Sequence, residues 1–402
     1  MRIAHITSQF PPLWGGVGNS THGQVEGLAS RGHEVHVITR NIPPGARMPP
    51  LDDNITVHHV PMLRLPMSFT TSFAKHAVKK LKELGNDFDL VHVHSNMALL
   101  QKRHYDEVRR PIVSTSHGTW RGERSMISWR DVTASGESLN DLAVLYLSPI
   151  FDRYEDYAFQ YSDAIIIECN NEIRAWKDRG VQNTFGDDRV VQLAAGVNTL
   201  QYRRENADPG VVERYGGDVG KPLVLFVGRL AARKGVFDAL MTFRKAHKEL
   251  PDSQIMILGS GPQDRALRKR VRSLGMEGSV HLIGSVPFPV LQAMYANADV
   301  LLFPSYWEGQ GLVPGEAMAS GTPVVASRVG WVPELVRPGE NGFHHGVREV
   351  DEAAGHLVNL LTDEGLRKKL GQQARKDIEE IWEWRHHIDR LERLYEEVAG
   401  DR

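Results

Sequence analysis

The sequence predicts an α/β fold built from two doubly wound domains, and three observations support this prediction. Short apolar runs alternate with longer amphipathic stretches along all 402 residues, which is typical of parallel strands covered by helices. Each half opens with an apolar run that leads into a glycine-containing loop, at 2–7 and at 223–228. A polar, glycine-rich stretch at 198–221 is the expected linker between the halves, and a chain of this length has room for a core in each.

The apolar runs give the expected strands, and the amphipathic stretches give the expected helices. Strands are expected at 2–7, 33–39, 90–95, 111–117, 163–169 and 190–195, and then at 223–228, 253–259, 280–284, 299–304 and 323–327. Helices are expected at 18–31, 73–84, 238–249, 264–274, 289–296 and 313–321, with a charged helical segment from about 365 to 400. We therefore expect an N-terminal domain over 1–197, a second domain over 198–375 and a terminal helix over 376–402.

Composition narrows the class of protein. The net charge of −2 gives no basic footprint for nucleic acid. The single cysteine, Cys169, excludes an intrachain disulfide and fits a reducing compartment. No apolar run approaches the roughly 18 residues needed to span a bilayer, and the N-terminus lacks a signal-peptide pattern. These features favour a cytoplasmic enzyme.

Two carboxylates near the end of the chain stand eight positions apart. Glu308 lies on a turn after the apolar run at 299–304, and Glu316 lies inside the helix that follows. Gly309 and Gly311 give the turn a backbone that can approach a ligand closely and direct N–H groups toward it. The pair can therefore bracket the two ends of one polyhydroxylated ligand, beside a helix N-terminus that favours anions.

Two cations follow the first strand of the second half. Arg229 and Lys234 stand five residues apart between that strand and a helix that opens near Gly235. Their spacing, next to a helix N-terminus, indicates a site for a diphosphate. Two further strand-end loops, at 258–267 and 282–291, are candidates to hold a nucleotide base through main-chain groups.

The N-terminal loop differs from a dinucleotide-binding loop. A dinucleotide-binding loop reads G-x-G-x-x-G, but the run from Gly16 reads G-V-G-N-S-T. Such a site also needs an acidic residue at the end of the second strand, and this strand ends on Arg40. A dehydrogenase is therefore disfavoured. Gly15 and Gly16 would instead let another molecule approach. His117 ends the strand at 111–117, where such folds place functional groups, although a lone histidine is also often structural.

No metal site is expected. Asp87-Phe88-Asp89 has the spacing of a metal-binding D-x-D motif, but it precedes a strand instead of ending one, so we interpret it as a turn. The histidines His92, His94, His344 and His345 do not form an H-E-x-x-H or similar ligand set.

One helix is a candidate for contact with a membrane. The segment 62–84 combines an apolar stretch with Lys75, Lys79, Lys80 and Lys82. A basic amphipathic helix can touch an anionic membrane surface. A solvated helix face is the more usual explanation of such a pattern, and both interpretations stay open.

Taken together, these residues resemble the retaining glycosyltransferases of group 1, or family 4 (GT4), which have the GT-B fold. The resemblance runs through nearly the whole chain. It rests on the GG loop at 15–16, the strand-end His117, AAGVN at 194–198, GRLAARKG at 228–235 and EGQGLVPGEAMASGTPVV at 308–325. It implies two Rossmann-like domains that face each other across a cleft, with the terminal helix crossing back onto the first.

The resemblance also implies a role for each site residue. Arg229 and Lys234 would bind the donor's diphosphate and stabilise the leaving group, and His117 would approach the transferred sugar. Glu316 would hold the nucleotide ribose. Glu308 would hold sugar hydroxyls, helped by backbone N–H groups of the turn formed by Gly309, Gln310, Gly311 and Leu312.

The expected reaction is metal-independent transfer of a hexose-type sugar from a nucleoside-diphosphate sugar to a hydroxyl acceptor, with no further cofactor. Because the carboxylates are committed to binding hydroxyls, we expect same-face attack in which the departing phosphate takes the acceptor's proton. The acceptor would be a glycan, a lipid-linked sugar or a small molecule. A non-catalytic nucleotide-sugar-binding protein, or another GT-B enzyme such as a phosphorylase or epimerase, is the alternative.

Several positions leave specificity open. Gln310, Trp331 and Ala195 differ from the usual family pattern, and the first two bear on the sugar. The stretch 119–142 follows His117 without a strong family pattern and is the candidate acceptor-facing region. The sequence does not indicate the oligomeric state.

Overall fold

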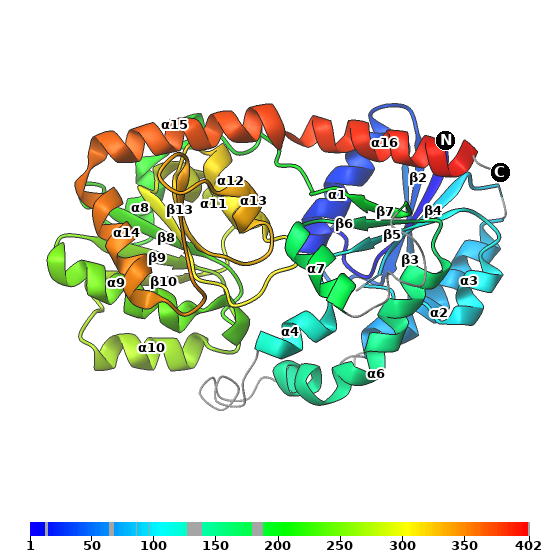
Figure 1. The fold of residues 1–402 in the computed structure, drawn as a ribbon, viewed down its shortest axis with the longest axis horizontal. Coiled ribbons are helices and arrows are strands. Elements are labelled where there is room, and N and C mark those ends of the chain that lie inside the picture. The colour runs from blue at the N-terminus through cyan, green and yellow to red at the C-terminus, as the bar shows by residue number, and fades with distance from the viewer. Residues whose placement is uncertain are drawn as a thin grey trace. The chain divides into compact units, whose positions relative to one another are not determined.

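A computed structural model of the chain describes residues 1–12, 15–63, 68–85, 87–95, 97–126, 139–178 and 188–400. The chain forms two compact units (Figure 1). The first contains Met1–Ser125, Leu139–Ala195 and Arg385–Arg402, and the second contains Gly196–Trp384. Residues 376–384, which we expected to belong to the terminal helix, therefore lie with the second unit.

The first unit is built on a seven-stranded parallel sheet with the order β3-β2-β1-β4-β5-β6-β7. Its strands are β1 (Arg2–Ile6), β2 (Glu34–Arg40), β3 (Ile55–Val60), β4 (Leu90–His94), β5 (Ile112–Ser116), β6 (Ala164–Ile167) and β7 (Val190–Gln192). Its helices are α1 (Gly16–Ala29), α2 (Ser68–Glu83), α3 (Lys102–Glu107), α4 (Trp120–Met126), α6 (Leu139–Tyr161) and α7 (Asn170–Asp178).

The second unit is built on a six-stranded parallel sheet with the order β10-β9-β8-β11-β12-β13. Its strands are β8 (Leu223–Val227), β9 (Gln254–Leu258), β10 (Val280–Gly284), β11 (Val300–Phe303), β12 (Val324–Ser327) and β13 (Gly342–His345). Its helices are α8 (Pro209–Arg214), α9 (Val236–Glu249), α10 (Asp264–Ser273), α11 (Phe288–Asn297), α12 (Leu312–Ala319), α13 (Val332–Leu335), α14 (Val350–Thr362) and α15 (Glu364–Ile381).

The central strands of both sheets are buried on both faces. In the first unit every residue of β4, β5 and β6 is buried, and in the second every residue of β9 and β11 is buried. Helices cover both faces of such a sheet, which explains why these strands read as continuous apolar runs in the sequence. The predicted α/β class with two doubly wound domains is confirmed.

Two expectations about the strands and the middle of the chain were wrong. The strands β3 and β13 were not predicted, and both lie at sheet edges, where polar side chains interrupt the apolar run. The stretch 198–221 is not a free linker, because it contains α8, whose Val211 and Val212 are buried.

The charged C-terminal segment forms two helices instead of one. The helix is interrupted at Trp382 and Glu383, between α15 and α16 (Trp384–Gly400). Within the first unit, α16 buries an apolar stripe and fastens its polar side to Arg31, whose guanidinium lies 2.5 Å from Asp389 and 2.6 Å from Glu392. The buried stripe consists of Ile388, Leu391, Leu394 and Tyr395. In the described part of the chain, no helix is both long and apolar enough to cross a bilayer.

Candidate active site

The donor-binding residues predicted in the second half of the chain lie near the point where the strand order of the second sheet reverses. The strand order reverses between β8 and β11, and ligands of doubly wound sheets bind beyond the carboxyl ends of strands at such a point. Arg229 and Lys234 follow β8, and Glu308 follows β11. Gly235 joins the two loops closely, since a Cβ there would lie 2.0 Å from the Pro304 carbonyl oxygen and its φ of 64° also favours glycine.

Glu308 is held as a carboxylate by two cations. The Lys234 ammonium donates to Glu308 Oε1 at 2.6 Å, and the Arg233 guanidinium lies 3.8 Å from Oε2. Burial would raise the pKa of Glu308, but Lys234 and Arg233 outweigh it and lower that pKa. Glu308 is therefore suited to accept hydrogen bonds from hydroxyls and not to donate a proton.

Arg229 has a different environment from its two neighbouring cations. Arg229 is exposed, and no carboxylate within the described ranges forms an ion pair with its guanidinium. Arg233, which the motifs in the sequence did not single out, takes part in the Glu308 cluster because the 3-10 turn Ala232–Lys234 places both side chains on the same loop. Arg229 thus keeps its five donors available for an anionic ligand.

Glu316 is gripped by two tyrosines. Tyr202 donates to its Oε1 at 3.0 Å, and Tyr295 donates to its Oε2 at 2.6 Å. Burial raises the pKa of Glu316, while the two tyrosine hydroxyls oppose that shift. Burial and the neighbouring Glu316 also hold both tyrosine pKa values well above their usual range. Neither tyrosine was predicted, because no local pattern links Tyr202, in the expected linker, or Tyr295, in the helix expected at 289–296, to Glu316.

The turn between Glu308 and α12 packs closely against Gly330 and Trp331. Gly311 caps the helix with a φ of 85°, and a Cβ on Gly330 would lie 2.4 Å from the Gln310 carbonyl oxygen. The backbone N–H of Trp331 donates to that same oxygen at 2.9 Å. The Trp331 ring is fully buried and packs on Trp382 with ring centroids 4.9 Å apart. Trp331 therefore supports the turn from the core, and Gln310, the departure from the family pattern that lies in the turn itself, is 4% exposed.

In the first unit, His117 follows β5 and lies between the ends of β4 and β6. Its Nε2 is 2.7 Å from His94 Nδ1, and its Nδ1 is 3.0 Å from Glu168 Oε1. Gly15 and Gly16 begin α1 after the first strand. A Cβ on Gly16 would meet nothing within 4 Å, so packing inside this unit does not require glycine there.

The first sheet also gathers three histidines that sequence spacing did not bring together. The ring nitrogens of His5, His92 and His94 include three that lie within 4.8 Å of one another, and all three residues are buried. His92 contacts the Tyr395 hydroxyl through Nδ1 and the Thr115 hydroxyl, at 2.6 Å, through Nε2. Protein groups thus occupy both nitrogens of His92, as they do both of His94.

The candidate acceptor-facing stretch, 119–142, lies largely outside the described residues. Its first part forms α4, which is fastened to α6 by Arg124. The Arg124 guanidinium donates to Ser148 at 2.5 Å and to Asp152 at 2.8 Å.

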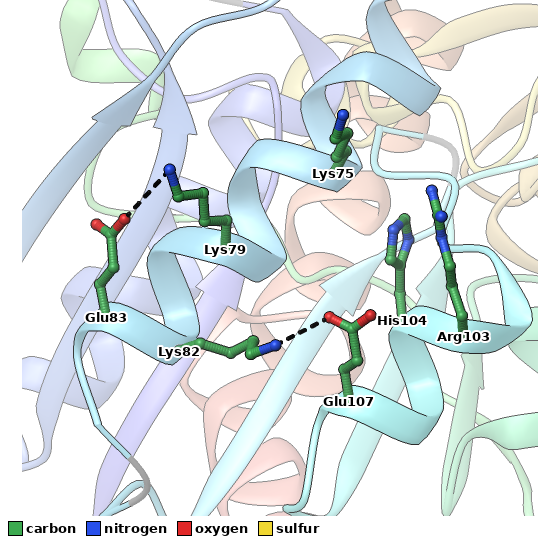
Figure 2. A pocket seen from close by; sticks show the side chains of 7 residues that line it. All are labelled: Lys75, Lys79, Lys82, Glu83, Arg103, His104 and Glu107. Carbon is green, nitrogen blue, oxygen red and sulfur yellow. Dashed lines mark hydrogen bonds and ion pairs between the residues drawn. The ribbon is translucent and has the colours of Figure 1, made fainter.

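A basic pocket lies apart from these residues, between α2 and α3 (Figure 2). It encloses about 430 Å³ and is lined by Lys75, Lys79, Lys82, Glu83, Arg103, His104 and Glu107. Figure 2 shows Lys82 reaching Glu107 and Lys79 reaching Glu83, at 3.3 Å and 3.9 Å. Among the described residues, no carboxylate forms an ion pair with Lys75 or Arg103.

Two Rossmann-like units, with cations and carboxylates at the reversal point of the second sheet, define a two-domain transferase of the GT-B class. The family model for glycosyl transferases group 1 matches residues 212–377, and that for glycosyltransferase family 4 matches residues 14–199. The chain belongs to this glycosyltransferase family, which confirms the resemblance drawn from its motifs.

Relatives of known structure or activity extend the match over the whole chain. The chain is 27% identical over 383 residues to the N-acetyl-alpha-D-glucosaminyl L-malate synthase of Bacillus anthracis, covering 93% of this chain and 92% of that protein. The sucrose-phosphate synthase of Thermosynechococcus elongatus superposes with a TM-score of 0.82 at 21% identity, covering 100% of both chains. HepE of Anabaena, solved with UDP-glucose, superposes with a TM-score of 0.74 at 18% identity, covering 99% of this chain and 100% of that chain.

Proposed function

We propose that this glycosyltransferase moves a hexose-type sugar from a nucleoside-diphosphate sugar to a hydroxyl acceptor, with retention of configuration and without a metal. The observation that supports it best is the arrangement at the ends of β8 and β11. Arg229 is exposed on the loop after β8, and the same loop carries Lys234, whose ammonium lies 2.6 Å from Glu308. Cations for a diphosphate and an ionised acceptor for sugar hydroxyls thus occur together.

The leaving group would be stabilised by fixed positive charge. Departure of a nucleoside diphosphate develops negative charge, which Arg229, Lys234 and the first turn of α12 can stabilise without a metal. An ammonium has three N–H donors, so Lys234 can keep its bond to Glu308 and still donate to a phosphate oxygen. This bond also holds Lys234 in place before the donor binds, which lowers the cost of ordering it.

The two carboxyl groups would bind the two ends of the donor. Each Glu316 oxygen accepts one tyrosine hydrogen bond, and a carboxylate oxygen has a second acceptor site that can take a ribose hydroxyl. Glu308 would accept hydroxyls of the sugar, beside the backbone N–H groups of 309–312. The first unit would contribute His117 to the sugar and Gly15 and Gly16 to the approach of the donor.

Retention would follow from attack on the face that the phosphate leaves. The bond from the acceptor oxygen to the anomeric carbon forms as the bond from that carbon to the phosphate oxygen breaks. The acceptor's proton passes to the departing phosphate. A double displacement would need a free carboxylate as nucleophile, and Glu308 is already paired with Lys234. The acceptor would be a glycan, a lipid-linked sugar or a small molecule.

A donor screen tests this proposal. The purified chain is incubated with UDP-, GDP- and ADP-sugars in EDTA, and the released nucleoside diphosphate is measured with and without candidate acceptors. We expect release from one donor class, and NMR coupling of the product should show the donor's anomeric configuration. Release that needs a divalent metal, or an inverted product, would contradict the corresponding part. Calorimetric binding without any release would favour a non-catalytic binding protein.

We also propose that the segment 62–84 touches an anionic membrane surface. The basic pocket supports this, because Lys75, Lys79, Lys82 and Arg103 exceed the two carboxylates, Glu83 and Glu107, that line it. Long lysine side chains on a helix can reach anionic headgroups while their methylenes stay near the surface.

Replacing Lys75, Lys79 and Lys82 together with alanine should therefore reduce binding to anionic vesicles. Each lysine near such a surface contributes about 1 kcal/mol, so we expect binding to fall by at least 10-fold in vesicle flotation at low salt. A matched variant with three exposed lysines of the second unit, Lys368, Lys369 and Lys376, replaced by alanine should bind as the unmodified chain does. Equal flotation with neutral and anionic lipid would show that these lysines do not direct membrane contact.

A further inference from the structure

Two buried carboxyl side chains hold the loop that carries His117. Glu168, at the end of β6, accepts from His117 Nδ1 at 3.0 Å. Glu172, in α7, contacts the Ser116 hydroxyl and accepts the Gly118 N–H at 3.0 Å. The residues are 4% and 5% exposed. Glutamates are seldom buried unless they are paired, and here both serve the three residues Ser116–Gly118.

A row of imidazole rings continues from His117 into the sheet. His117 Nε2 lies 2.7 Å from His94 Nδ1, with ring planes 4° apart. His94 Nε2 in turn lies 3.3 Å from His5 Nδ1. In the described part of the chain, His5 Nε2 is buried without a hydrogen-bond partner. The row therefore has a carboxyl group at one end and a bare ring nitrogen at the other.

These contacts determine where the protons lie. The Glu168 carboxylate only accepts, so His117 carries its proton on Nδ1. Burial holds the pKa of His94 well below its usual range and lowers that of His5 to about 3, so both rings are neutral at pH 7. If His94 donated toward His5, the bare Nε2 of His5 would become a buried N–H without an acceptor. The protons therefore point the other way, from His5 to His94 to His117 to Glu168.

Glu172 acts on the backbone of the same loop. Burial, opposed by the Ser116 hydroxyl and reinforced by the charge of Glu168, raises the pKa of Glu172 to about 8. The groups that face it are Ser116 and Gly118 from the β5 end, Glu168 from β6 and Trp176 from α7. When Glu172 is protonated, it does not repel the nearby carboxylate of Glu168. Glu168 is the carboxyl group that contacts His117.

We infer that Glu168 and Glu172 are positioning residues that hold a proton of His117 on Nδ1, so that its Nε2 accepts a hydrogen bond from a sugar hydroxyl in place of His94. This inference rests on the proposed function for the sugar contact, but the tautomer itself can be measured without activity. It assigns His117 the role of acceptor, and it assigns the motif E-C-N-N-E at 168–172 to the site.

Ring ¹⁵N NMR of the full chain tests the tautomer. We expect the His117 proton on Nδ1 in the unmodified chain and a mixture of tautomers in Glu168→Gln, where the neutral amide no longer selects one. Glu396→Gln is the control, because it makes the same change at an exposed residue of α16 in the same unit, and it should leave the His117 tautomer unchanged. A His117 proton on Nε2 in the unmodified chain would overturn the inference. So would a stoichiometric metal retained by His5, His92 and His94 after dialysis.

Turnover gives a second readout. Misplaced groups near the reacting atoms cost up to about 10²-fold, so we expect Glu168→Gln to lower kcat by about 10-fold with a smaller change in KM. It should cause no further loss in a His117→Ala background, and an additive loss would show a merely structural role. Glu396→Gln, at the exposed control position, should keep activity. Unchanged turnover in His117→Ala would refute the proposed sugar contact while leaving the NMR result to decide the positioning.

Discussion

Replacing Lys234 with alanine is expected to lower kcat by about 10²- to 10³-fold, the usual cost of removing one charge-stabilising donor. The ammonium lies 2.6 Å from Glu308 and carries the charge closest to it. Its removal takes away a donor for the departing phosphate and leaves Glu308 with Arg233 alone, 3.8 Å away. The pKa of Glu308 should then rise, because burial already pushes it upward. Both effects weaken donor binding in the transition state.

Arg229→Ala should cause a loss of similar size, since its exposed guanidinium is the other cation expected at the diphosphate. Lys221→Ala provides the control, because Lys221 is an exposed cation of the same unit that pairs only loosely with Asp218, at 3.8 Å. Steady-state nucleotide release measures kcat and KM, and circular dichroism confirms folding. Turnover near normal in both Lys234→Ala and Arg229→Ala would refute the assignment of the leaving-group site.

The sequence predicted the central strands well and the sheet edges poorly. Strands such as β9 and β11 are buried on both faces, so their composition alone marks them. The edge strand β3 has a single buried residue, Val60, and carries His58 and His59 next to each other, which hides its periodicity. The return of the chain into the first unit begins nine residues later than expected, because α15 packs against α12 in the second unit before the break at Trp382.

Site residues that belong to a contiguous motif could be predicted, and those brought in by tertiary contacts could not. Glu308 and Lys234 stand in two recognisable segments, although their ion pair joins positions 74 apart. Tyr202 meets Glu316 across 114 positions, and Glu168 meets His117 across 51. No local pattern carries such a pairing. Only the parallel order of the strands, which brings the ends of β4, β5 and β6 together, could have pointed to Glu168.

Acid should unfold the first unit before the second. His5 and His387 are buried in the first unit, and burial lowers their pKa values to about 3 and about 4. The same cause holds the pKa values of His92 and His94 well below their usual range. Below the unfolded-state value of 6.5, the unfolded chain binds protons that the folded chain does not. Stability is thus unaffected above pH 6.5 and is lost as the pH falls toward the folded-state values.

The expected loss is large compared with the stability of a domain. At pH 5, His5 and His387 each cost roughly 2 kcal/mol, and His92 and His94 add to this in the same direction. Domains are usually stable by about 5–15 kcal/mol. Hydrogen exchange followed by mass spectrometry at pH 7.5, 6 and 5 should show β1, β4 and α16 losing protection first, while β8, β9 and β11 stay protected.

Proton uptake on unfolding separates this cause from general acid destabilisation. His387 donates from Nδ1 to the Ala194 carbonyl at 2.8 Å, and the Gln24 amide donates to its Nε2 at 3.2 Å, so it is neutral in the folded chain. His387→Gln should lower the proton uptake between pH 6.5 and 4 by about one, read from the slope of unfolding free energy against pH. His386→Gln, at an exposed neighbouring residue, should leave the slope unchanged. Equal slopes for the two variants would show that His387 does not contribute.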